Sequence, residues 1–329
     1  MRLARLPRVS LCVLPTPLRR AVRLEAALGP GCPRIYLKRD DLTGLAFGGN
    51  KGRKLEYLVA AAENAGADTL VTEGAVQSNH ARMTAAAAAA RGLGCVLVLD
   101  ARNGDAIEGN LLLDHLFGAE VRIVPAAAAR TEAMECATDD LRAAERRPFV
   151  IPTGGSVPLG AAGYVRAAFE LAEQLLAAGE TPSRLYLATG SLGTQAGLVV
   201  GARAASQPWE VYGVAVSHPA ASLVEKGIAL ADDTAALLGI DTTFGAADLT
   251  VDGSFVGEAY GKRTSEGLEA IRLLARTEGV LLDPVYSAKA MAALLAHVRA
   301  GQFAPEEAIV FLHTGGGPSL FAHGPALLA

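Results

Sequence analysis

The stretch GGNKGRK at residues 48–54 places Lys51 after two glycines and directly before an amphipathic segment typical of a helix. Glycines let the backbone approach a ligand closely, and a helix start presents unpaired N–H groups to an anion. A nucleotide-binding P-loop has glycine directly before its lysine and serine or threonine directly after it. Here Asn50 precedes Lys51 and Gly52 follows it, so another chemistry must account for the lysine.

Small and hydroxyl-bearing residues follow four of the strands that the sequence predicts. Ligands of open parallel sheets bind beyond the carboxyl ends of the strands, so these segments and GGNK are expected to line one cleft. The segments are GAVQSNH (74–80), TGG (153–155), TGSLGTQAG (189–197) and HTGGG (313–317). The third is typical of a loop that holds a phosphate monoester with backbone N–H groups at a helix start. A phosphate-bearing cofactor that requires a lysine suggests pyridoxal phosphate, which is held as a Schiff base.

Strands and helices alternate along most of the chain and must position these residues. After Lys51, apolar residues recur at helical spacing up to a stop at Gly66. Helices are also predicted at 79–91, near 107–117, near 130–145 and between most of the later strands. The predicted strands are 69–74, 95–100, 119–124, 148–155, 184–190, 210–216, 280–283 and 309–316. Continuous apolar strands alternating with helices predict an α/β fold with parallel sheets covered on both faces, whereas residues 231–260 give no clear pattern.

The composition excludes several classes of protein. A chain of 329 residues with 51% hydrophobic and 19% charged residues is globular and long enough for two domains. A net charge of -4 without a basic block predicts a small-molecule partner and no nucleic acid or acidic membrane. The first ten residues lack the apolar core of a signal peptide, and no run approaches the ~20 apolar residues of a membrane span, so a cytoplasmic protein is expected. Widely spaced cysteines without a CxxC pair, and His80 and His313 without ligand spacing, predict neither a disulfide nor a metal site.

Several motifs in order make the chain similar, over nearly its whole length, to the fold-type II pyridoxal-phosphate enzymes of the D-cysteine desulfhydrase and aminocyclopropane-carboxylate deaminase group. They are LPTPL (14–18), IYLKRDDLTG (35–44), GGNKGRKLEYL (48–58), GAVQSNHAR (74–82), TGSLGTQAGL (189–198), LLDPVYSAKAM (281–291) and FLHTGG (311–316). The resemblance implies two open, twisted, mainly parallel sheets flanked by helices, with the cofactor between two domains. It further implies a small inserted domain at 48–160, a large cofactor-binding domain from 1–47 and 161–329, domain closure over the substrate, and a homodimer.

The resemblance also implies roles for individual residues. Lys51 corresponds to the Schiff-base lysine, and Asn50 shapes the same loop. The positions that correspond to the phosphate loop are Gly190, Ser191, Gly193 and Thr194. Thr314 resembles the hydroxyl partner of the pyridine nitrogen, and Asn79 the partner of the cofactor's 3-hydroxyl. The residues expected around the substrate are Gln77, Ser78, Asn79, His80, Tyr260, Tyr286 and Ser287, of which Ser78 meets the carboxylate and the two tyrosines act with Lys51 in catalysis.

Simpler explanations remain open for some of these residues. A lysine at a helix N-terminus opposes the helix dipole, so a capping role explains Lys51 poorly. Ser78 and Asn79, by contrast, are typical of a helix cap before the Ala-rich segment that follows. Tyr260 and Tyr286 have the alternative of being core aromatics with a bonded hydroxyl.

Two positions bear on the reaction that the resemblance implies. Deaminases of the group that open the cyclopropane ring carry Glu after the second tyrosine and Leu where this chain has Thr314, whereas Ser287 follows Tyr286 here. A hydroxyl at Thr314 can leave the pyridine nitrogen neutral, and the resulting weaker electron sink favours prompt loss of a β-leaving group. The expected reaction is β-elimination from D-cysteine to pyruvate, ammonia and hydrogen sulfide, with Tyr286 as the acid, or the hydrogen-bond donor, for the departing sulfur.

Other functions stay open at this point. L-Cysteate is the near alternative substrate, because sulfo-lyases can show Tyr-Ser at that place and VGEAYG (256–261) is similar to the cysteate enzymes. Ring-opening deamination is less favoured. A nucleotide-binding protein is disfavoured because the Ser or Thr that follows the P-loop lysine is missing here. A noncatalytic amino-acid-binding protein would not need Lys51, Tyr286 and Thr314 together. A purified protein that is yellow, and whose colour shifts with an amino acid, separates the enzyme from the last two.

Overall fold

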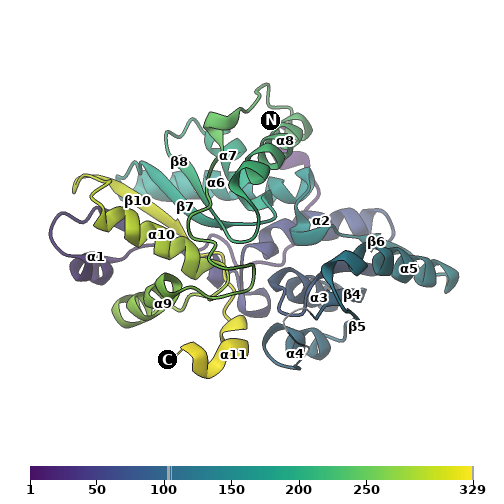
Figure 1. Cartoon of the computed structure of the whole chain (residues 1–329). Helices are drawn as coiled ribbons and strands as arrows, with labels where there is room; N and C mark the ends of the chain where they lie inside the picture. The colour runs from purple at the N-terminus through teal and green to yellow at the C-terminus, as the bar shows by residue number, and fades with distance from the viewer. Residues whose placement is uncertain (102–103, 105, 328–329) are drawn as a thin grey trace.

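Two β-sheets, each covered by helices on both faces, make up the fold (Figure 1). The computed structural model describes residues 1–101, 104 and 106–327. The strands are β1 (Leu18–Arg20), β2 (Arg34–Lys38), β3 (Thr69–Ala75), β4 (Gly94–Asp100), β5 (Glu120–Val124), β6 (Pro148–Val150), β7 (Arg184–Thr189), β8 (Glu210–Ala215), β9 (Thr250–Asp252) and β10 (Ala308–Leu312). The helices are α1 (Val22–Leu28), α2 (Lys51–Asn64), α3 (Asn79–Arg91), α4 (Gly109–Leu116), α5 (Arg130–Ala143), α6 (Pro158–Ala178), α7 (Gly193–Ala204), α8 (Ala220–Leu238), α9 (Ser265–Glu278), α10 (Ser287–Arg299) and α11 (Ser319–His323). The predicted α/β class with two mainly parallel sheets is confirmed.

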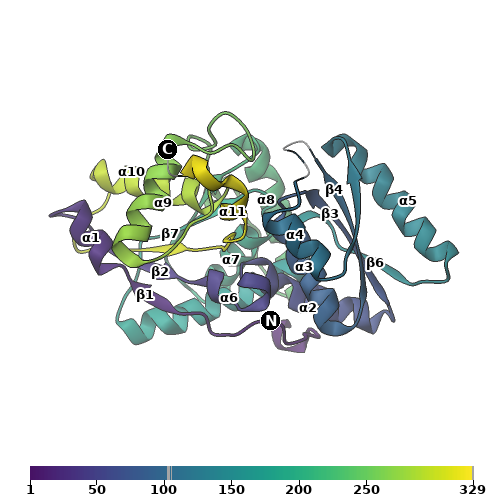
Figure 2. The same ribbon diagram turned by 90° about the horizontal axis from the view of Figure 1, so that it is seen from below.

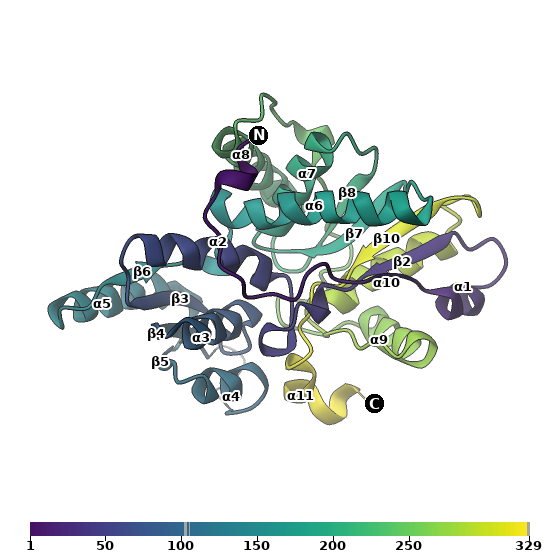
Figure 3. The same cartoon turned by 180° about the vertical axis from the view of Figure 1, so that it is seen from behind.

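The larger sheet has the strand order β1-β2-β10-β7-β8-β9, and among these strands only β1 runs antiparallel to its neighbour. Successive residues of its central strand β10 face opposite sides. Val310 and Leu312 pack with α6, α7 and α8 (Figure 3), whereas Ile309 and Phe311 pack with α1, α9 and α10. Because helices bury both faces, the strand reads as a continuous apolar run.

The smaller sheet has the order β5-β4-β3-β6, and its strands are all parallel. In β4, Leu97 and Leu99 pack with α2, α3 and α4, whereas Val96 and Val98 pack with α5. Figure 2 shows this sheet beside the larger one, with α5 at the end of the molecule away from it. Both sheets therefore carry the two-sided burial that the sequence predicts.

A network of buried charges fixes the start of α2 against the larger sheet. Arg53 donates to both carboxylate oxygens of Asp40, at 2.8 Å each, and to Glu170 of α6 at 2.8 and 2.9 Å. Burial alone would raise the pKa of Asp40, but the Arg53 guanidinium outweighs it and holds that pKa below its usual range. The pair is therefore charged, and it holds the helix turn that also carries Lys51.

The prediction of a strand at 280–283 is wrong. Val280 and Leu282 are buried against α9 and α10, whereas Leu281 between them is exposed, so the side chains alternate as they would in a strand. The backbone nevertheless joins neither sheet and leads directly into the cap of α10. Alternate burial without a neighbouring strand produced the misleading signal.

Other boundaries also differ from the sequence-based expectation. The predicted strands at 148–155 and 309–316 are present but end at Val150 and Leu312, because turns containing Gly154 and Gly315 at positive φ follow them. Residues 231–260, which gave no pattern, hold the end of α8, the short strand β9 and the loop toward α9. Strand β1 was not predicted, since it has three residues, two of them arginines.

The division into domains at 48 and 160 stays a prediction. Strands of the larger sheet come from residues 18–38 and 184–312, and those of the smaller sheet from 69–150. Helix α2 packs against α6, which covers one face of the larger sheet (Figure 3). Among the described residues, no helix is both long enough and apolar enough to cross a membrane.

Candidate active site

A cavity of about 370 Å³ lies where the carboxyl ends of strands from both sheets face the start of α2. The loops after β3, β7, β8 and β10 line it, which is where ligands of parallel sheets bind. The predicted site residues that line it are Asn50, Lys51, Ser78, Asn79, His80, Gly190, Ser191, Thr194, Tyr260, Tyr286 and Thr314. Gln77, Gly193 and Ser287 lie outside this lining. The structure thus brings together most of the residues that the sequence singled out.

Lys51 is the first residue of α2, and it lines the cavity. Its Nζ donates to Asn50 Oδ1 at 3.0 Å, and Asn50 Nδ2 donates to Thr194 Oγ1 at 2.9 Å. The backbone N–H of Asn50 donates to the carbonyl of Thr314 at 3.0 Å. Burial, together with the nearby Arg82 guanidinium, lowers the pKa of Lys51 to about 8 against the opposing attraction of a carboxylate. Lys51 therefore carries a neutral amine far more often than an ordinary lysine does.

The start of α7 forms an anion cradle beside Lys51. The backbone N–H of Gly193 donates to Ser156 Oγ at 3.2 Å, and that hydroxyl donates to Ser191 Oγ at 2.8 Å. Lys54, one helical turn after Lys51, is buried and donates to Gly154 O at 3.0 Å and to Ser156 Oγ at 3.3 Å. A Cβ on Gly193 would lie 2.7 Å from Lys54 Nζ and 3.0 Å from Ser156 Cα, so glycine at this position leaves room for both residues at the helix start.

The residues of the cradle fit a phosphate group. Burial, followed by repulsion from Lys51, holds the pKa of Lys54 well below its usual range. In the described part of the chain, neither lysine has a carboxylate within 4.0 Å. Two lysine amines without a carboxylate partner, beside the N-terminal amides of a twelve-residue helix, are suited to an anion, because a bound anion would favour their protonated forms.

Lys54 and Ser156 are site residues that the sequence analysis missed. The signal for Lys54 was its spacing of three residues from Lys51, which places both on one face of a helix. Ser156 comes from the segment after β6 and meets the α7 loop only in the folded chain. No local pattern marks it.

Ser78 combines a structural role with access to the cavity. It is the N-cap of α3, where its Oγ accepts from the backbone N–H of Ala81 at 3.2 Å. The alternative of a helix cap is therefore correct, and the cap lines the cavity as well. Gly74 makes room for it, because a Cβ at that position would lie 2.6 Å from Ser78 Oγ.

His80 is neutral and anchored on the small sheet. Thr72 Oγ1 donates to the carbonyl of Ile151 at 2.7 Å, so the contact of 3.0 Å between Thr72 Oγ1 and His80 Nε2 requires the ring N–H to donate. Burial, followed by repulsion from Lys51 and Lys54, holds the pKa of His80 well below its usual range. The ring therefore brings no positive charge to the cavity, and its unprotonated Nδ1 is left as an acceptor.

Tyr260 and Tyr286 meet hydroxyl to hydroxyl at the open side of the cavity. Their ring centroids are 6.0 Å apart and the rings are inclined at 70°. Tyr286 directly precedes α10, where the Asp283 carboxylate accepts from its backbone N–H at 2.8 Å. Tyr260 lies on the loop between β9 and α9, and Lys289 Nζ ties that loop to α10 by donating to Val256 O at 2.6 Å. One helix thus positions both hydroxyls.

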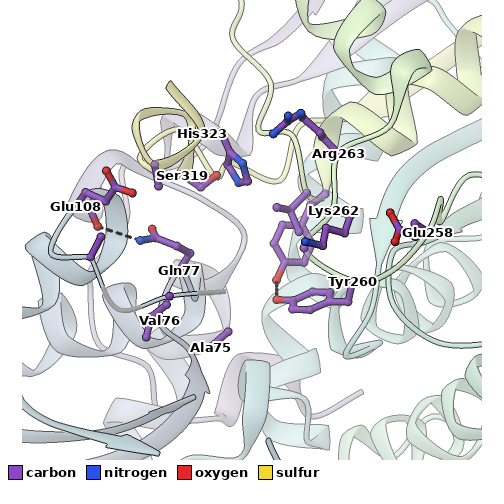
Figure 4. Close-up of a pocket in the computed structure, with 16 residues that line it drawn as sticks. Ala75, Val76, Gln77, Glu108, Glu258, Tyr260, Lys262, Arg263, Ser319 and His323 are labelled. Atoms are coloured by element: carbon purple, nitrogen blue, oxygen red, sulfur yellow. Dashed lines mark hydrogen bonds between the residues drawn. The ribbon is translucent and has the colours of Figure 1, made fainter. Parts of the chain in front are cut away.

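A second cavity of about 680 Å³ adjoins the first and shares Ala75, Tyr260 and Tyr286 with it. Figure 4 shows Gln77 and Glu108 on one side of this space and Tyr260, Lys262 and Arg263 on the other. The tyrosine pair thus stands between the two spaces. Gln77, predicted to contact substrate, lines this outer cavity and not the inner one.

Ser287 and Thr314, the two positions that bear on the reaction, lie in different surroundings. Ser287 Oγ donates to Asp283 Oδ1 at 2.6 Å and accepts from the Asp283 N–H at 2.8 Å, and its side chain is buried. The structure does not bring it to either cavity. Thr314 does line the inner cavity, two residues after the end of β10.

The inner cavity is suited to proton transfer by lysine and tyrosine. Among the described residues that line it, there is neither an aspartate nor a glutamate. An anionic substrate group therefore meets no like charge there. A neutral amine at Lys51 can accept a proton, and the hydroxyls of Tyr260 and Tyr286 can donate one.

Comparisons with known proteins agree with this geometry. The sequence model of a family described as "Pyridoxal-phosphate dependent enzyme" matches residues 9–315. A D-cysteine desulfhydrase of Klebsiella pneumoniae (strain 342) is 44% identical over 330 residues, covering 99% of this chain and 98% of the relative. A D-cysteine desulfhydrase of Yersinia enterocolitica is 45% identical over 329 residues, covering 98% of each. The crystal structure of an ACC deaminase homologue superposes with a TM-score of 0.90 at 38% identity, covering 99% of this chain and 97% of that one.

Proposed function

Because the chain belongs to the family of pyridoxal-phosphate dependent enzymes, we propose that it cleaves the carbon–sulfur bond of D-cysteine by β-elimination. One water is consumed, and pyruvate, ammonia and hydrogen sulfide are formed. The observation that carries the proposal is the full-length similarity to D-cysteine desulfhydrases. The cavity supports it, because it joins a lysine amine, an anion cradle and two phenol hydroxyls without a carboxylate among its described lining residues.

Pyridoxal 5'-phosphate is the cofactor of this family, and the residues present fit it. Lys54, Ser156 and the N-terminal amides of α7 would hold the phosphate, and Thr314 would face the pyridine nitrogen. Lys51 would hold the aldehyde carbon, with Asn79 at the 3-hydroxyl. When bound, the cofactor withdraws electrons from the substrate's α-carbon and thereby acidifies its proton.

Lys51 is the base in this proposal. Its lowered pKa increases the fraction of neutral amine at neutral pH, and the neutral amine is the form that can take up the α-proton. Asn50 Oδ1 accepts from Lys51 Nζ and keeps the amine at one place in the cavity, and Thr194 in turn holds the Asn50 amide.

The substrate carboxylate is assigned to the start of α3. The first backbone N–H groups of a helix have no partners within it and favour an anion. Ser78 lies at that helix start and lines the cavity, so its hydroxyl can add a hydrogen bond. A neutral His80 leaves the carboxylate with hydrogen-bond partners and no fixed cation that would bind it too tightly.

Tyr286 and Tyr260 serve the leaving group. As the carbon–sulfur electron pair leaves with sulfur, a phenol proton can pass to the thiolate, and a positioned acid contributes about 10²–10⁴-fold to such a step. The hydrogen bond between the two hydroxyls lets the second tyrosine stabilise the first once it has given up its proton. Both rings also border the outer cavity, through which sulfide can depart.

The direct test is turnover by the purified protein with its cofactor. We expect D-cysteine to give sulfide and pyruvate in equal amounts, L-cysteate to give no sulfite, and aminocyclopropane carboxylate to give no ketobutyrate. Sulfite from L-cysteate at the higher kcat/KM would replace the proposal with a sulfo-lyase. A protein that stays colourless with added pyridoxal phosphate would refute both.

Borohydride reduction tests the position of the cofactor. We expect pyridoxyl label on Lys51 and none on Lys54, whose ammonium faces the phosphate cradle. Lys51→Ala should still bind the cofactor weakly through the cradle. Peptide mapping that finds the label on Lys54 would overturn the assignment of the two lysines.

We also expect a homodimer with a cytoplasmic location and closure of the smaller domain over the substrate. Sedimentation velocity measures the oligomeric state, and cell fractionation measures the location. Crystal forms with and without a substrate analogue test domain closure, and identical domain positions in both forms would contradict closure.

A further inference from the structure

The start of α4 is built to hold the segment 77–79, which borders both cavities. The backbone N–H of Asn110 donates to Gln77 Oε1 at 2.9 Å, and Asn110 Nδ2 donates to the carbonyl of Gln77 at 2.8 Å and to Asn79 Oδ1 at 3.0 Å. Gln77 Nε2 donates back to the carbonyl of Glu108 at 3.0 Å (Figure 4). Asn110 itself is fully buried.

Gly109 allows this close approach. Its φ of +54° lies in the left-handed region, and a Cβ there would lie 2.6 Å from Gln77 Oε1. A side chain at this position would therefore push Gln77 away from the α4 start. The contact between the two segments thus depends on the Gly109–Asn110 pair as a unit.

Main-chain partners fix which way each amide points. A backbone carbonyl only accepts, so the Asn110 atom that lies 2.8 Å from Gln77 O must be the NH₂ nitrogen. A second proton of that NH₂ group reaches Asn79, so the Asn79 atom that receives it must be the carbonyl oxygen. The remaining polar atom of the Asn79 side chain is then Nδ2, a donor.

The donor end of Asn79 is left for the cavity. Asn79 lines the inner cavity, and among the described residues Nδ2 has no hydrogen-bond partner. We propose that Asn110 is a positioning residue that orients the Asn79 amide so that its NH₂ group, and not its carbonyl, faces the cofactor's 3-oxygen. This inference rests on the proposed function, because it assumes that the cofactor occupies the inner cavity.

The orientation has an electrostatic consequence for the bound cofactor. An NH₂ group that donates to the 3-oxygen stabilises its ionised form, whereas an amide carbonyl at the same place repels that form. Hydrogen bonds to charged groups are strong enough to change the ratio of ionised to protonated oxygen by about 10- to 100-fold. These two forms of the cofactor absorb at different wavelengths, so the ratio is read directly from the spectrum.

Asn110→Asp is the sharpest test. The change keeps the shape of the side chain and the backbone N–H that binds Gln77 Oε1, but it replaces the donor shared by Gln77 O and Asn79 Oδ1 with an acceptor. The Asn79 amide then turns its NH₂ group toward the introduced carboxylate and its carbonyl toward the cavity. We expect the absorption band of the ionised form to weaken and the shorter-wavelength band of the protonated form to grow. The ratio of ionised to protonated 3-oxygen should fall by about 10- to 100-fold.

A double-mutant cycle separates this role from a merely structural one. Asn79→Ala removes the donor and should lower the ratio by itself, so Asn110→Asp added to it should change the ratio by less than about twofold. Asn110→Ser is the second variant, because it introduces no buried charge and its short side chain cannot reach both Gln77 and Asn79. We expect it to lower the ratio of ionised to protonated 3-oxygen as well. Circular dichroism and thermal unfolding confirm that each variant is folded.

The outcomes distinguish failure of this inference from failure of the proposed function. A wild-type protein without a cofactor band would refute the proposed function. Three results would assign Asn110 a structural role and overturn the inference. The first is a folded Asn110→Asp or Asn110→Ser variant that keeps the wild-type ratio of ionised to protonated 3-oxygen. The others are independent effects of the two substitutions in the double-mutant cycle, and loss of the cofactor without a change in that ratio.

Discussion

The lowered pKa of Lys51 predicts how the cofactor-free protein captures pyridoxal phosphate as the pH changes. Burial, together with repulsion from Arg82, lowers this pKa to about 8, although Asp283 acts in the opposite direction. At pH 7 about one molecule in ten then carries the neutral amine, whereas a lysine with a pKa near 10.4 does so in about one molecule in 2500. Lys51 thus holds about 200-fold more of the reactive amine than a free lysine.

Stopped-flow absorbance of imine formation measures this difference between pH 6 and 11. We expect the second-order rate constant to rise about tenfold per pH unit below pH 8 and to level off above it. Nα-acetyl-lysine with the same cofactor solution is the matched control, because dividing the two rates removes the cofactor's own ionisations. A Lys51 rate that keeps rising in parallel with the control up to pH 10 would refute the argument from burial.

Four further changes test other parts of the site and fold. Tyr286→Phe should lower turnover of D-cysteine by about 10²–10⁴-fold but that of β-chloro-D-alanine far less, because chloride leaves without a proton; equal losses would assign the ring to binding. Lys54→Met should weaken cofactor affinity, measured by equilibrium dialysis, by about 10- to 100-fold, since it removes a charged donor to the phosphate. Burial raises the pKa of Asp114 from 3.8 to about 8, so the folded chain keeps a proton there that the unfolded chain has lost, and stability should fall as the pH rises through this window. Urea unfolding of Asp114→Asn should lack that slope. Arg53→Leu should lower the free energy of unfolding by about 3–5 kcal/mol, because it leaves the Asp40 carboxylate buried without its guanidinium.

The sequence predicted the parts of the site that local patterns encode. Lys51 stood out because its glycine-rich loop and helix start failed the P-loop pattern. The segments 189–197 and 313–317 followed from small residues at the ends of apolar strands, where parallel sheets place their ligands, whereas the roles of Thr194 and Thr314 within them came from the family resemblance. These signals depend only on neighbours in the chain and on the two-sided burial of the strands, so the sequence carries them without tertiary information.

Residues that act through distant partners could not be predicted in the same way. Asn110 and Ser156 meet their partners only after the chain has folded, since each contacts a segment more than 30 residues away. Ser287 was expected at the substrate because it follows Tyr286, yet its hydroxyl faces Asp283. Sequence proximity to a site residue does not tell which side of a helix start a side chain occupies. Short edge strands were missed for a related reason, since β1 and β9 have three residues each and are defined by pairing alone.

Basic side chains at the start of α2 fall into two groups with different roles, Arg53 in the structure and Lys51 and Lys54 in the site. Arg53 is paired with Asp40 and Glu170, so its charge is compensated inside the protein and fixes the helix. Lys51 and Lys54, on the same turn as Arg53, have only neutral hydrogen-bond partners among the described residues. An uncompensated buried cation destabilises the folded chain, and natural sequences keep such groups where a ligand supplies the opposite charge. The Arg53 network therefore holds Lys51 and Lys54 in place on α2. The negative charge that would balance their protonated amines comes from an anionic ligand, and the phosphate of the cofactor fills that role.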